Sequence, residues 1–202
     1  MTLWDDSTDA VTATADRLAD AAISIIARDG FDALSVRRVA REAAVTGGTV
    51  QHHYPSKVDL TVAALDRTVS RQAQRISSLP RAATPVAQLT NELCAMLPAD
   101  PASTEEAVVW IAMSAAAPGH PFVAERRREA AEQARRWIAS RIRGSQHAGI
   151  VDAAVDPDVV GPMIEAALDG MMLQAIAEDD SLTVSCQRLR DIVERVLQIA
   201  PT

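Results

Sequence analysis

Apolar residues recur every three or four positions along most of the chain, which is the spacing of one face of an α-helix. The first such stripe predicts a helix over residues 12–28, with Leu18, Ala22 and Ile26 on its inner face. Gly30 is placed to end this helix, because glycine readily adopts the left-handed conformation found after a helix C-terminus. Breaks that contain proline or glycine separate further stripes, which predict helices over residues 36–45, 49–54, 57–76, 86–97, 107–117, 122–143, 157–177 and 182–199.

The composition agrees with a helical protein. Alanine is abundant and only 3% of the residues are aromatic, which favours closely packed helices over sheets. A chain of 202 residues can hold one small and one larger domain. We therefore expect an all-α fold of about nine helices: a disordered segment over residues 1–11, a three-helix head over residues 12–58, and a larger body over residues 59–202.

The stretch from Ser35 to Lys57 has the pattern of two short helices joined by a tight turn. Ser35 is a natural N-cap, and the helix after it carries small apolar residues on one face and arginines on the other. Thr46 can cap the second helix, which Pro55 cannot continue. Two short helices around such a turn form a helix-turn-helix, whose second helix can enter the major groove of DNA.

Polar side chains on and beside the second helix are the candidate DNA contacts. Gln51 can make a bidentate contact to adenine, and its neighbours Thr49 and His52 are the other candidates for reading bases. Basic residues around them are expected on phosphates, which fix the register and supply salt-dependent affinity. The whole candidate set is Arg37, Thr46, Gly48, Thr49, Gln51, His52, His53 and Lys57, with Arg37, His53 and Lys57 on phosphates and Thr46 suited to either role.

The run from Val45 to Lys57 also resembles the signature of the TetR family of transcriptional regulators. The resemblance implies a three-helix DNA-binding head on a ligand-binding and dimerisation body. It also implies a repressor that a small effector releases from its operator, although an activator would carry the same signature. Gln51 and Gly47 depart from the family, which usually has an aromatic residue and a longer side chain there. Gly47 and Gly48 either let the backbone approach DNA closely or form the turn, and we expect the turn.

The last two predicted helices carry more apolar surface than one protomer can bury. Two copies meeting about a two-fold axis would bury it as a four-helix bundle. Such a homodimer would present two recognition helices to a palindromic operator. The expected interface residues are Ile164, Leu168, Met172, Leu189, Ile192 and Val196.

Methionine and tryptophan side chains on the middle helices suggest where an effector binds. Methionine adapts to irregular apolar ligands, and these helices are expected to converge. We expect a small, mostly apolar effector to bind among them and to bias the spacing of the two heads, so that DNA is released. The alternative is that each residue is simply core. The candidate pocket residues are Met96, Trp110, Met113, Met163 and Met171.

Charge separates the head from the rest of the chain. The net charge of −7 argues against a surface for indiscriminate nucleic-acid binding. From Ser35 to Lys57, however, three arginines and the only lysine stand against Glu42 alone, so this window is locally positive. A second arginine-rich run, over residues 125–136, is interspersed with glutamates at helical spacing and predicts a solvated face with weak ion pairs.

Other classes of function find little support. Without a nucleophile elbow, an HExxH motif or a phosphate-binding glycine loop, no enzyme is expected, and adjacent His52 and His53 lack the companions of a metal site. No cofactor is predicted. Cys94 and Cys186 are expected to be small buried residues rather than a redox switch. With no apolar run of membrane-spanning length recognised, we expect a cytoplasmic protein without a membrane partner. A helical ligand-binding bundle that does not bind DNA is the alternative.

Overall fold

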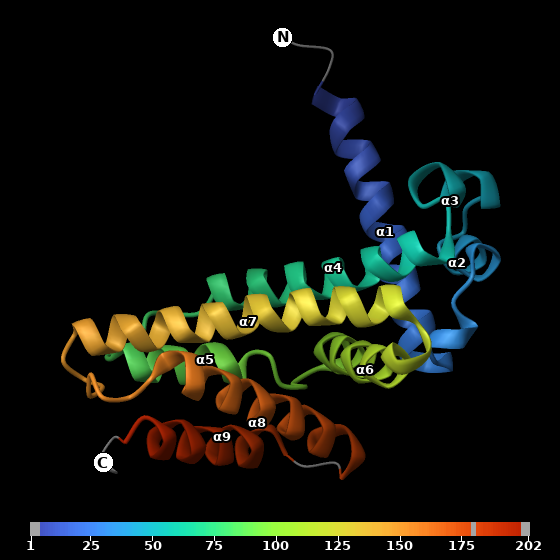
Figure 1. Cartoon of the computed structure of the whole chain (residues 1–202). Helices are drawn as coiled ribbons and strands as arrows, with labels where there is room; N and C mark the ends of the chain where they lie inside the picture. Colours follow the sequence, from blue (N-terminus) through green and yellow to red (C-terminus); the bar gives the residue numbers. More distant parts are fainter. Residues whose placement is uncertain (1–4, 179–180, 199–202) are drawn as a thin grey trace. The chain divides into compact units, whose positions relative to one another are not determined.

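The computed structural model describes residues 5–178 and 181–198, with side chains from residue 12 onward (Figure 1). Within these residues there are nine α-helices, two short 3-10 turns and no strand, which confirms the predicted all-α fold. The α-helices are α1 (Asp5–Asp29), α2 (Val36–Glu42), α3 (Gly47–His53), α4 (Lys57–Ser77), α5 (Pro85–Cys94), α6 (Pro101–Ala116), α7 (Pro121–His147), α8 (Pro157–Ala177) and α9 (Leu182–Val196). The 3-10 turns are η1 (Phe31–Ala33) and η2 (Ala117–Gly119).

Helices α1 and α6 begin several residues before their predicted starts. Helix α1 begins at Asp5, so residues 5–11 are helical rather than disordered, and residues 1–4 lie outside the described part of the chain. Acidic residues at a helix N-terminus interact favourably with the helix dipole, and the acidic composition that suggested disorder is compatible with this helix end. Helix α6 begins at Pro101, which was expected to mark a break. Proline is tolerated in the first turn of a helix, where its missing N–H has no intrahelical partner.

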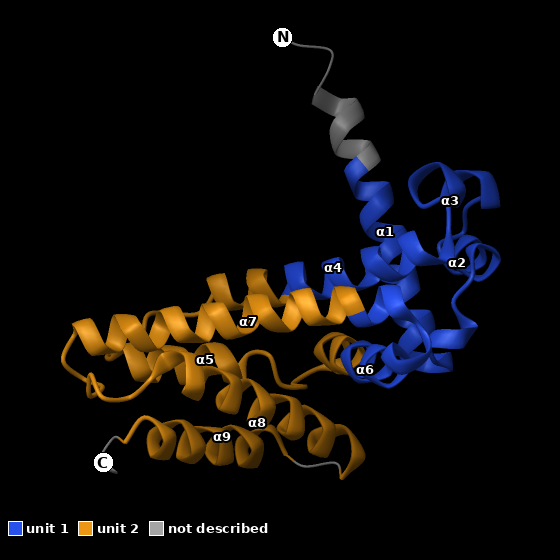
Figure 2. Cartoon of the chain, viewed as in Figure 1, with its two compact units in different colours: residues 1–71, 108–124 blue, residues 72–107, 125–202 orange. Residues whose placement is uncertain are grey.

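The chain forms two compact units (Figure 2). Unit 1 comprises residues 1–71 and 108–124, and unit 2 comprises residues 72–107 and 125–202. The first unit therefore includes the first part of α4, whereas the sequence suggested a boundary after residue 58. Arg67 on α4 explains the difference, because its guanidinium donates to Asp16 and Asp20 on α1 at 2.7 Å each. Arg71 adds a second ion pair to Asp20 at 2.9 Å.

Unit 1 is held by apolar side chains from five helices. Gly30 has a φ of 85° and its N–H donates to the Ile26 carbonyl at 3.0 Å, so it ends α1 as predicted. Phe31 then turns inward and is buried. The fully buried side chains of this unit include Leu18, Ile23, Ile26, Leu34, Val39, Val50, Leu60 and Met113.

Unit 2 combines an apolar core with buried carboxylates. Its buried apolar residues include Leu89, Leu93, Ile138, Ile142, Ile164, Leu189 and Val193. Among them lie Glu92, Glu106 and Glu165, each at most 7% exposed. Arginines from other segments neutralise these groups: Arg141 donates to Glu92 at 2.8 Å, Arg75 to Glu106 at 2.6 Å and Arg135 to Glu165 at 3.3 Å.

The arginine-rich face of α7 is consequently only partly the solvated surface that the sequence suggested. Arg126 and Arg136 form the expected pairs with Glu129 and Glu132 along the helix surface. Arg135, by contrast, reaches the buried Glu165 on α8. Helical spacing within one segment cannot show partners on another helix, so the prediction missed these cross-helix pairs.

Helix α8 is long and apolar enough to cross a membrane by length and composition, which corrects the expectation that no segment reaches that length. Its surroundings indicate the core helix of a helical bundle instead. Glu165 in its middle is buried against Arg135, and its neighbour α9 packs along it within unit 2. Burying a carboxylate is costly unless it is paired, and here a charged partner from the same protein supplies the pairing.

The two cysteines lie close together although 92 positions separate them in the sequence. The Cys94 thiol, at the end of α5, lies 3.9 Å from the backbone carbonyl of Cys186 on α9. Burial raises the pKa of the Cys94 thiol to about 12. Only the thiolate is a good nucleophile, so this environment is unfavourable to a reactive cysteine. Both side chains are partly exposed, however, and not the buried residues that the sequence suggested.

Candidate DNA-binding site

Helices α2 and α3 form the helix-turn-helix that the sequence predicted. The Ser35 hydroxyl accepts from the Arg38 N–H at 3.3 Å and caps α2. The chain then turns through Ala44, whose φ is 54°, and the Val45 N–H donates to the Ala40 carbonyl at 2.9 Å. Thr46 caps α3, because its hydroxyl accepts from the Thr49 N–H at 3.1 Å. Side chains thus cap the first turn of each of the two helices.

The prediction that the two glycines form the turn is wrong. Gly47 and Gly48 are the first residues of α3, and neither has a positive φ. The left-handed conformation falls on Ala44 instead, at a cost of about 1 kcal/mol for a residue that has a Cβ atom. A Cβ at Gly47 would meet no atom within 4 Å, and one at Gly48 would meet only the Thr46 hydroxyl at 3.7 Å. The fold itself therefore leaves room for a side chain at both positions.

Helix α3 turns an apolar residue inward and polar residues outward. Val50 is fully buried, whereas Gln51 and His52 are exposed. Thr49 is partly exposed, and its hydroxyl lies 2.9 Å from that of Thr46, so each hydroxyl already has one hydrogen-bond partner. Gln51 and His52 are the side chains of this helix with the most freedom to meet another molecule.

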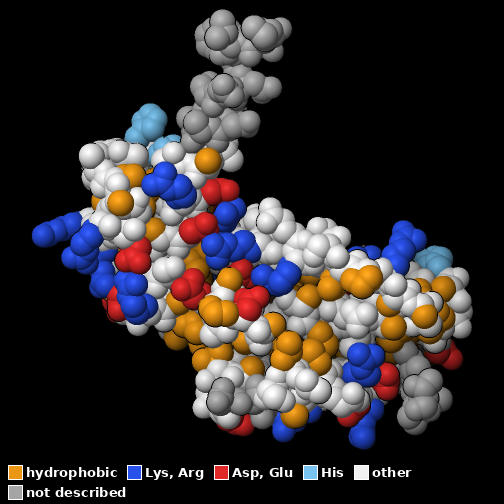
Figure 3. Space-filling view, turned by 180° about the vertical axis from the view of Figure 1, so that it is seen from behind, with side chains coloured by type: hydrophobic (Ala, Val, Ile, Leu, Met, Phe, Trp, Pro, Cys, Tyr) orange, Lys and Arg blue, Asp and Glu red, His pale blue; other side chains and the backbone are white. Residues whose placement is uncertain are grey.

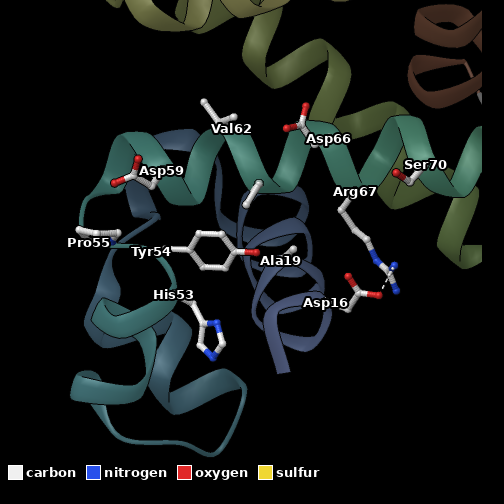
Figure 4. A pocket seen from close by; sticks show the side chains of 11 residues that line it. Asp16, Ala19, His53, Tyr54, Pro55, Asp59, Val62, Asp66, Arg67 and Ser70 are labelled. Carbon is white, nitrogen blue, oxygen red and sulfur yellow. Dashed lines mark hydrogen bonds and ion pairs between the residues drawn. The ribbon is translucent and has the colours of Figure 1, made fainter. Parts of the chain in front are cut away.

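His53 and Tyr54 lie on the other side of α3, beside a hollow of about 430 Å³ (Figure 4). Figure 4 shows Tyr54 reaching toward α1, with Ala19 near the tip of its ring. The Tyr54 hydroxyl donates to the Ala15 carbonyl at 3.3 Å, and burial raises the pKa of this phenol, which keeps it a neutral donor. Tyr54 is thus tied to α1 within unit 1 and is not among the side chains free to meet another molecule. His53 lines the same hollow, which makes it less available to an outside partner than His52.

Basic side chains gather over the part of unit 1 that carries α2 and α3, with carboxylates among them (Figure 3). Two of these arginines are already paired: Arg38 with Asp29, and Arg28 with Glu42. The second pair lowers the pKa of Glu42, chiefly through its hydrogen bond from Arg28. Carboxylates thus cancel part of the positive charge that residue counting assigned to this surface.

The cations left for an outside partner are fewer than the sequence suggested. Arg37 and Arg41 are exposed and form no hydrogen bond or ion pair with the described residues. The Lys57 ammonium lies 4.7 Å from the centre of the Phe31 ring and donates to the Asp32 carbonyl at 3.3 Å. Lys57 therefore has to leave these two partners before it can bind a phosphate.

Two arginines on other helices support the site, and sequence reasoning missed both. Arg17 on α1 donates to the carbonyl of Ala43, the C-cap residue of α2, at 3.1 Å. Arg67 ties α4 to α1, as described above. Each looks like an ordinary exposed charge on an amphipathic helix, so spacing within its own segment carried no signal.

The five predicted pocket residues are divided between the units. Trp110 and the buried Met113 belong to unit 1, whereas Met96, Met163 and Met171 belong to unit 2. Met163 is 52% exposed, which contradicts its assignment to an enclosed pocket. The stripe that carries it faces outward because α8 buries its other side against its own unit.

Most of the predicted interface residues also face inward. Ile164, Leu168, Met172 and Leu189 are buried within unit 2, so they offer no surface to a partner, while Ile192 and Val196 are partly exposed. The exposed face of α8 carries different residues at the alternating spacing of four and three that a packed helix pair uses. These are Val159, Met163, Ala166, Gly170, Leu173 and Ala177. The error arose because an all-round apolar helix does not show which face is inside.

Comparison with known families agrees with this geometry. A model described as "Bacterial regulatory proteins, tetR family" matches residues 18–64, which hold α2 and α3. A model described as "BetI-type transcriptional repressor, C-terminal" matches residues 85–199, which is more than half of the chain. The chain belongs to the TetR family. Membership points to a transcriptional regulator rather than an enzyme.

Individual members resemble the chain over different lengths. The transcriptional repressor KstR of Mycobacterium tuberculosis is 40% identical over 74 residues, which are 36% of this chain and 34% of the repressor's own length. A transcriptional regulator from Rhodococcus sp. Rha1 has a solved structure with a TM-score of 0.79 and 28% identity, over 93% of this chain and 99% of its own. A candidate regulator from Saccharomonospora viridis, solved in complex with choline, shares the fold, with a TM-score of 0.75 and 24% identity over 91% and 96% of the two chains.

Proposed function

We propose that this TetR-family protein is a transcriptional repressor that binds a palindromic operator as a homodimer. The observation that carries the proposal is the construction of α3. Its exposed side chains are hydrogen-bonding groups, its inner residue Val50 is fully buried, and Thr46 fixes its first turn. A short helix anchored in this way can present Gln51 to the major groove without ordering itself on binding.

Within the site we assign reading and anchoring to different residues. Gln51 and His52 are the proposed base readers, with Thr49 beside them. Arg37 is the main proposed phosphate contact, because it has no hydrogen bond or ion pair with the described residues to break first. Arg41 is also exposed, and we add it to the proposed phosphate contacts. Lys57 and His53 remain proposed phosphate contacts of lesser weight, since each already faces groups of its own head.

The exposed stripe on α8 supports the homodimer. Val159, Met163 and Leu173 are 58%, 52% and 51% exposed, which is unusual for large apolar side chains spaced along one helix face. Ala166 and Gly170 stand between them, and a Cβ at Gly170 would meet no atom within 4 Å of its own protomer. Small residues at the centre of such a stripe let a second helix approach closely. We therefore place the dimer contact on this face, with the partly exposed Ile192 and Val196 of α9 beside it.

The proposed effector site lies in the helical body. The helical body offers adaptable side chains such as Met96 and Met171 in unit 2, which suit a small, mostly apolar molecule. The choline complex of the S. viridis protein supports the idea that this fold accommodates small ligands. Binding in the body would shift the spacing of the two heads and lower operator affinity. A repressor of this kind acts on DNA in the cytoplasm.

Selection of bound sequences from random double-stranded DNA tests the proposal. We expect a two-fold symmetric motif with half-sites about one helical turn apart, or a multiple of it. Arg128→Gln, an exposed change on α7 in unit 2, is the matched control and should select the same motif. Recovery of no motif by the dimeric wild-type protein would favour a helical ligand-binding bundle that does not bind DNA.

Repression and activation need a second measurement. A reporter gene placed behind the selected motif should be silent when the protein is present and expressed when it is absent. Higher expression in the presence of the protein would identify an activator and overturn the repressor assignment.

A further inference from the structure

Unit 2 contains a polar hollow of about 500 Å³ that the function proposed above does not use. The loop before α5, helix α5 and the second half of α7 form its walls. Its volume lies within the range of known small-molecule pockets. Its polar lining residues are Arg81, Thr84, Gln88, Glu92, Ser140 and Arg141.

Glu92 is the unusual member of this lining. It is 3% exposed, and one of its oxygens, Oε1, accepts from Arg141 at 2.8 Å and from Gln88 at 3.1 Å. The other oxygen, Oε2, is buried and has no hydrogen-bond partner among the described residues. The side-chain Oε1 of Gln88 in turn accepts from the Ala82 N–H at 2.7 Å, which fixes the loop beside the carboxylate. Glu92 is therefore held in place by hydrogen bonds to one oxygen, while its other oxygen has no donor among the described residues.

Glu106, another buried carboxylate of the same unit, has a hydrogen-bond donor for each of its oxygens. Arg75 reaches both oxygens of Glu106, at 3.4 Å and 2.6 Å, in a bidentate pair. Among the described side chains, Glu92 Oε2 is the one buried carboxylate oxygen without a donor. Leaving such an oxygen unpaired costs free energy, and a donor supplied by a ligand would recover it.

The same hollow presents donors as well as this acceptor. Arg81 is exposed and forms no hydrogen bond or ion pair with the described residues, so its whole guanidinium is available. Arg141 uses one nitrogen on Glu92 and lies 5.7 Å from the centre of the Trp137 ring, which holds it in place and leaves other N–H groups to donate. Guanidinium groups favour carboxylate ligands, because their paired N–H donors match the two oxygens.

We propose that this hollow binds a small zwitterion of the α-amino acid class. The ammonium group would donate to Glu92, and the carboxylate would accept from Arg81 and Arg141. In an α-amino acid the ammonium and carboxylate groups are joined through a single carbon atom. The molecule can therefore reach the Glu92 acceptor and the arginine donors, which line neighbouring walls of the hollow, at the same time. This site differs in chemistry from the mostly apolar effector site proposed above, and ligand binding to it does not depend on DNA binding.

Isothermal titration of the full chain with the standard L-α-amino acids, one at a time, tests the proposal directly. For an amino acid that binds, the amino alcohol lacks the carboxylate and the deaminated acid lacks the ammonium group. Each analogue should bind at least about tenfold more weakly, because each leaves one side of the hollow unpaired. The proposal is overturned if no amino acid binds, or if an analogue without one of the two charges binds as well as the parent.

Two variants locate the binding in this hollow. Arg81→Gln changes an exposed side chain and should leave the thermal unfolding temperature unchanged while weakening the amino acid at least about tenfold. Glu92→Gln keeps the shape of the side chain and removes the charge that the ammonium group needs, so it should abolish binding. Arg128→Gln, an exposed arginine of the same unit outside the hollow, is the matched control and should bind as the wild type does. Unchanged affinity in Arg81→Gln would place the ligand elsewhere and refute the site, even if Glu92→Gln failed to fold.

Discussion

Helices α3 and α8 expose opposite kinds of side chain. In α3 the inward residue is apolar Val50 and the outward residues are polar Gln51 and His52. In α8 the inward face includes the charged Glu165, paired with Arg135, while the outward face carries apolar Met163. The two helices thus expose opposite kinds of side chain.

The inversion indicates what kind of partner each surface suits. An exposed polar face on an apolar anchor matches a partner made of donors and acceptors, such as the edges of bases. An exposed apolar stripe with small residues at its centre matches another apolar helix, and a second copy of the same stripe supplies one. The following predictions test this contrast, beginning with the largest expected effect.

Removal of the apolar anchor should have the largest consequence. Val50→Asp places an unpaired carboxylate at a fully buried position, which should lower the free energy of unfolding by at least about 3 kcal/mol. Operator binding should be lost together with the fold of the head. Urea denaturation followed by circular dichroism measures the first effect, and fluorescence anisotropy with labelled DNA measures the second. Gln51→Asp, one residue further along, is the matched control and should change stability by no more than about 0.5 kcal/mol.

A charged substitution in the exposed stripe of α8 should weaken the dimer without destabilising the protomer. Met163→Glu places a charge in the proposed interface, and the dimer dissociation constant should rise at least about tenfold, because two like charges are then buried near the two-fold axis. Sedimentation velocity over a range of protein concentrations measures this. Unfolding of the protomer should be nearly unaffected, since Met163 is half exposed.

The adjacent buried residue provides the contrasting variant. Ile164→Ala should lower protomer stability by about 2–5 kcal/mol through the cavity that it leaves. A Met163→Glu protein that remains dimeric would show that this face of α8 is not the interface.

Truncation of the proposed base reader should have a smaller and more selective effect. Gln51→Ala should lose roughly 1–3 kcal/mol of discrimination at one base pair of each half-site, because the alanine cannot make the bidentate contact. Competition binding against operators with single base changes measures the loss. Equal weakening on every sequence would show that Gln51 reads no base and only supports affinity.

The sequence predicted elements well wherever the deciding signal was local. Ser35 and Thr46 cap their helices as expected, because a cap acts on N–H groups only a few residues away. The helix-turn-helix was found for the same reason. The side of each helix that faces the protomer's own core was predicted poorly. Ile164 and Leu189 were assigned to the dimer interface but are buried within the protomer. An apolar residue does not encode which of two apolar neighbours will cover it.

The availability of charged side chains was also poorly predicted, because it depends on partners that are distant in the sequence. Counting residues gave the window from Ser35 to Lys57 a positive charge, but Asp29, which lies outside this window, neutralises Arg38 from another helix. The half-satisfied state of Glu92 was also invisible in the sequence, since it depends on Gln88 and Arg141 meeting on one oxygen. Long-range pairing decides which charges stay available to a ligand.

Comparison of two proposed phosphate contacts tests this point. Arg37→Ala should lower the salt dependence of binding by about one in the slope of log affinity against log salt, on operator and random DNA alike. Lys57→Ala should lower the slope by less, because the Lys57 ammonium already has Phe31 and the Asp32 carbonyl as partners. Titrations at several salt concentrations measure both slopes. If Lys57→Ala has the larger effect, Lys57 leaves these partners on binding and takes the main phosphate contact.

The smallest expected effect concerns Gly48, where the fold and the proposed DNA contact make opposite demands. Gly48→Ala adds a methyl group that meets only the Thr46 hydroxyl at 3.7 Å, so the fold should tolerate it. The free energy of unfolding should rise by up to about 1 kcal/mol, because alanine loses less conformational freedom in a helix than glycine. Operator affinity should nevertheless fall if the bare backbone at the start of α3 approaches DNA closely. Thermal denaturation and anisotropy on the same preparation separate the two effects, and higher stability with unchanged DNA affinity would show that close approach is not why glycine stands there.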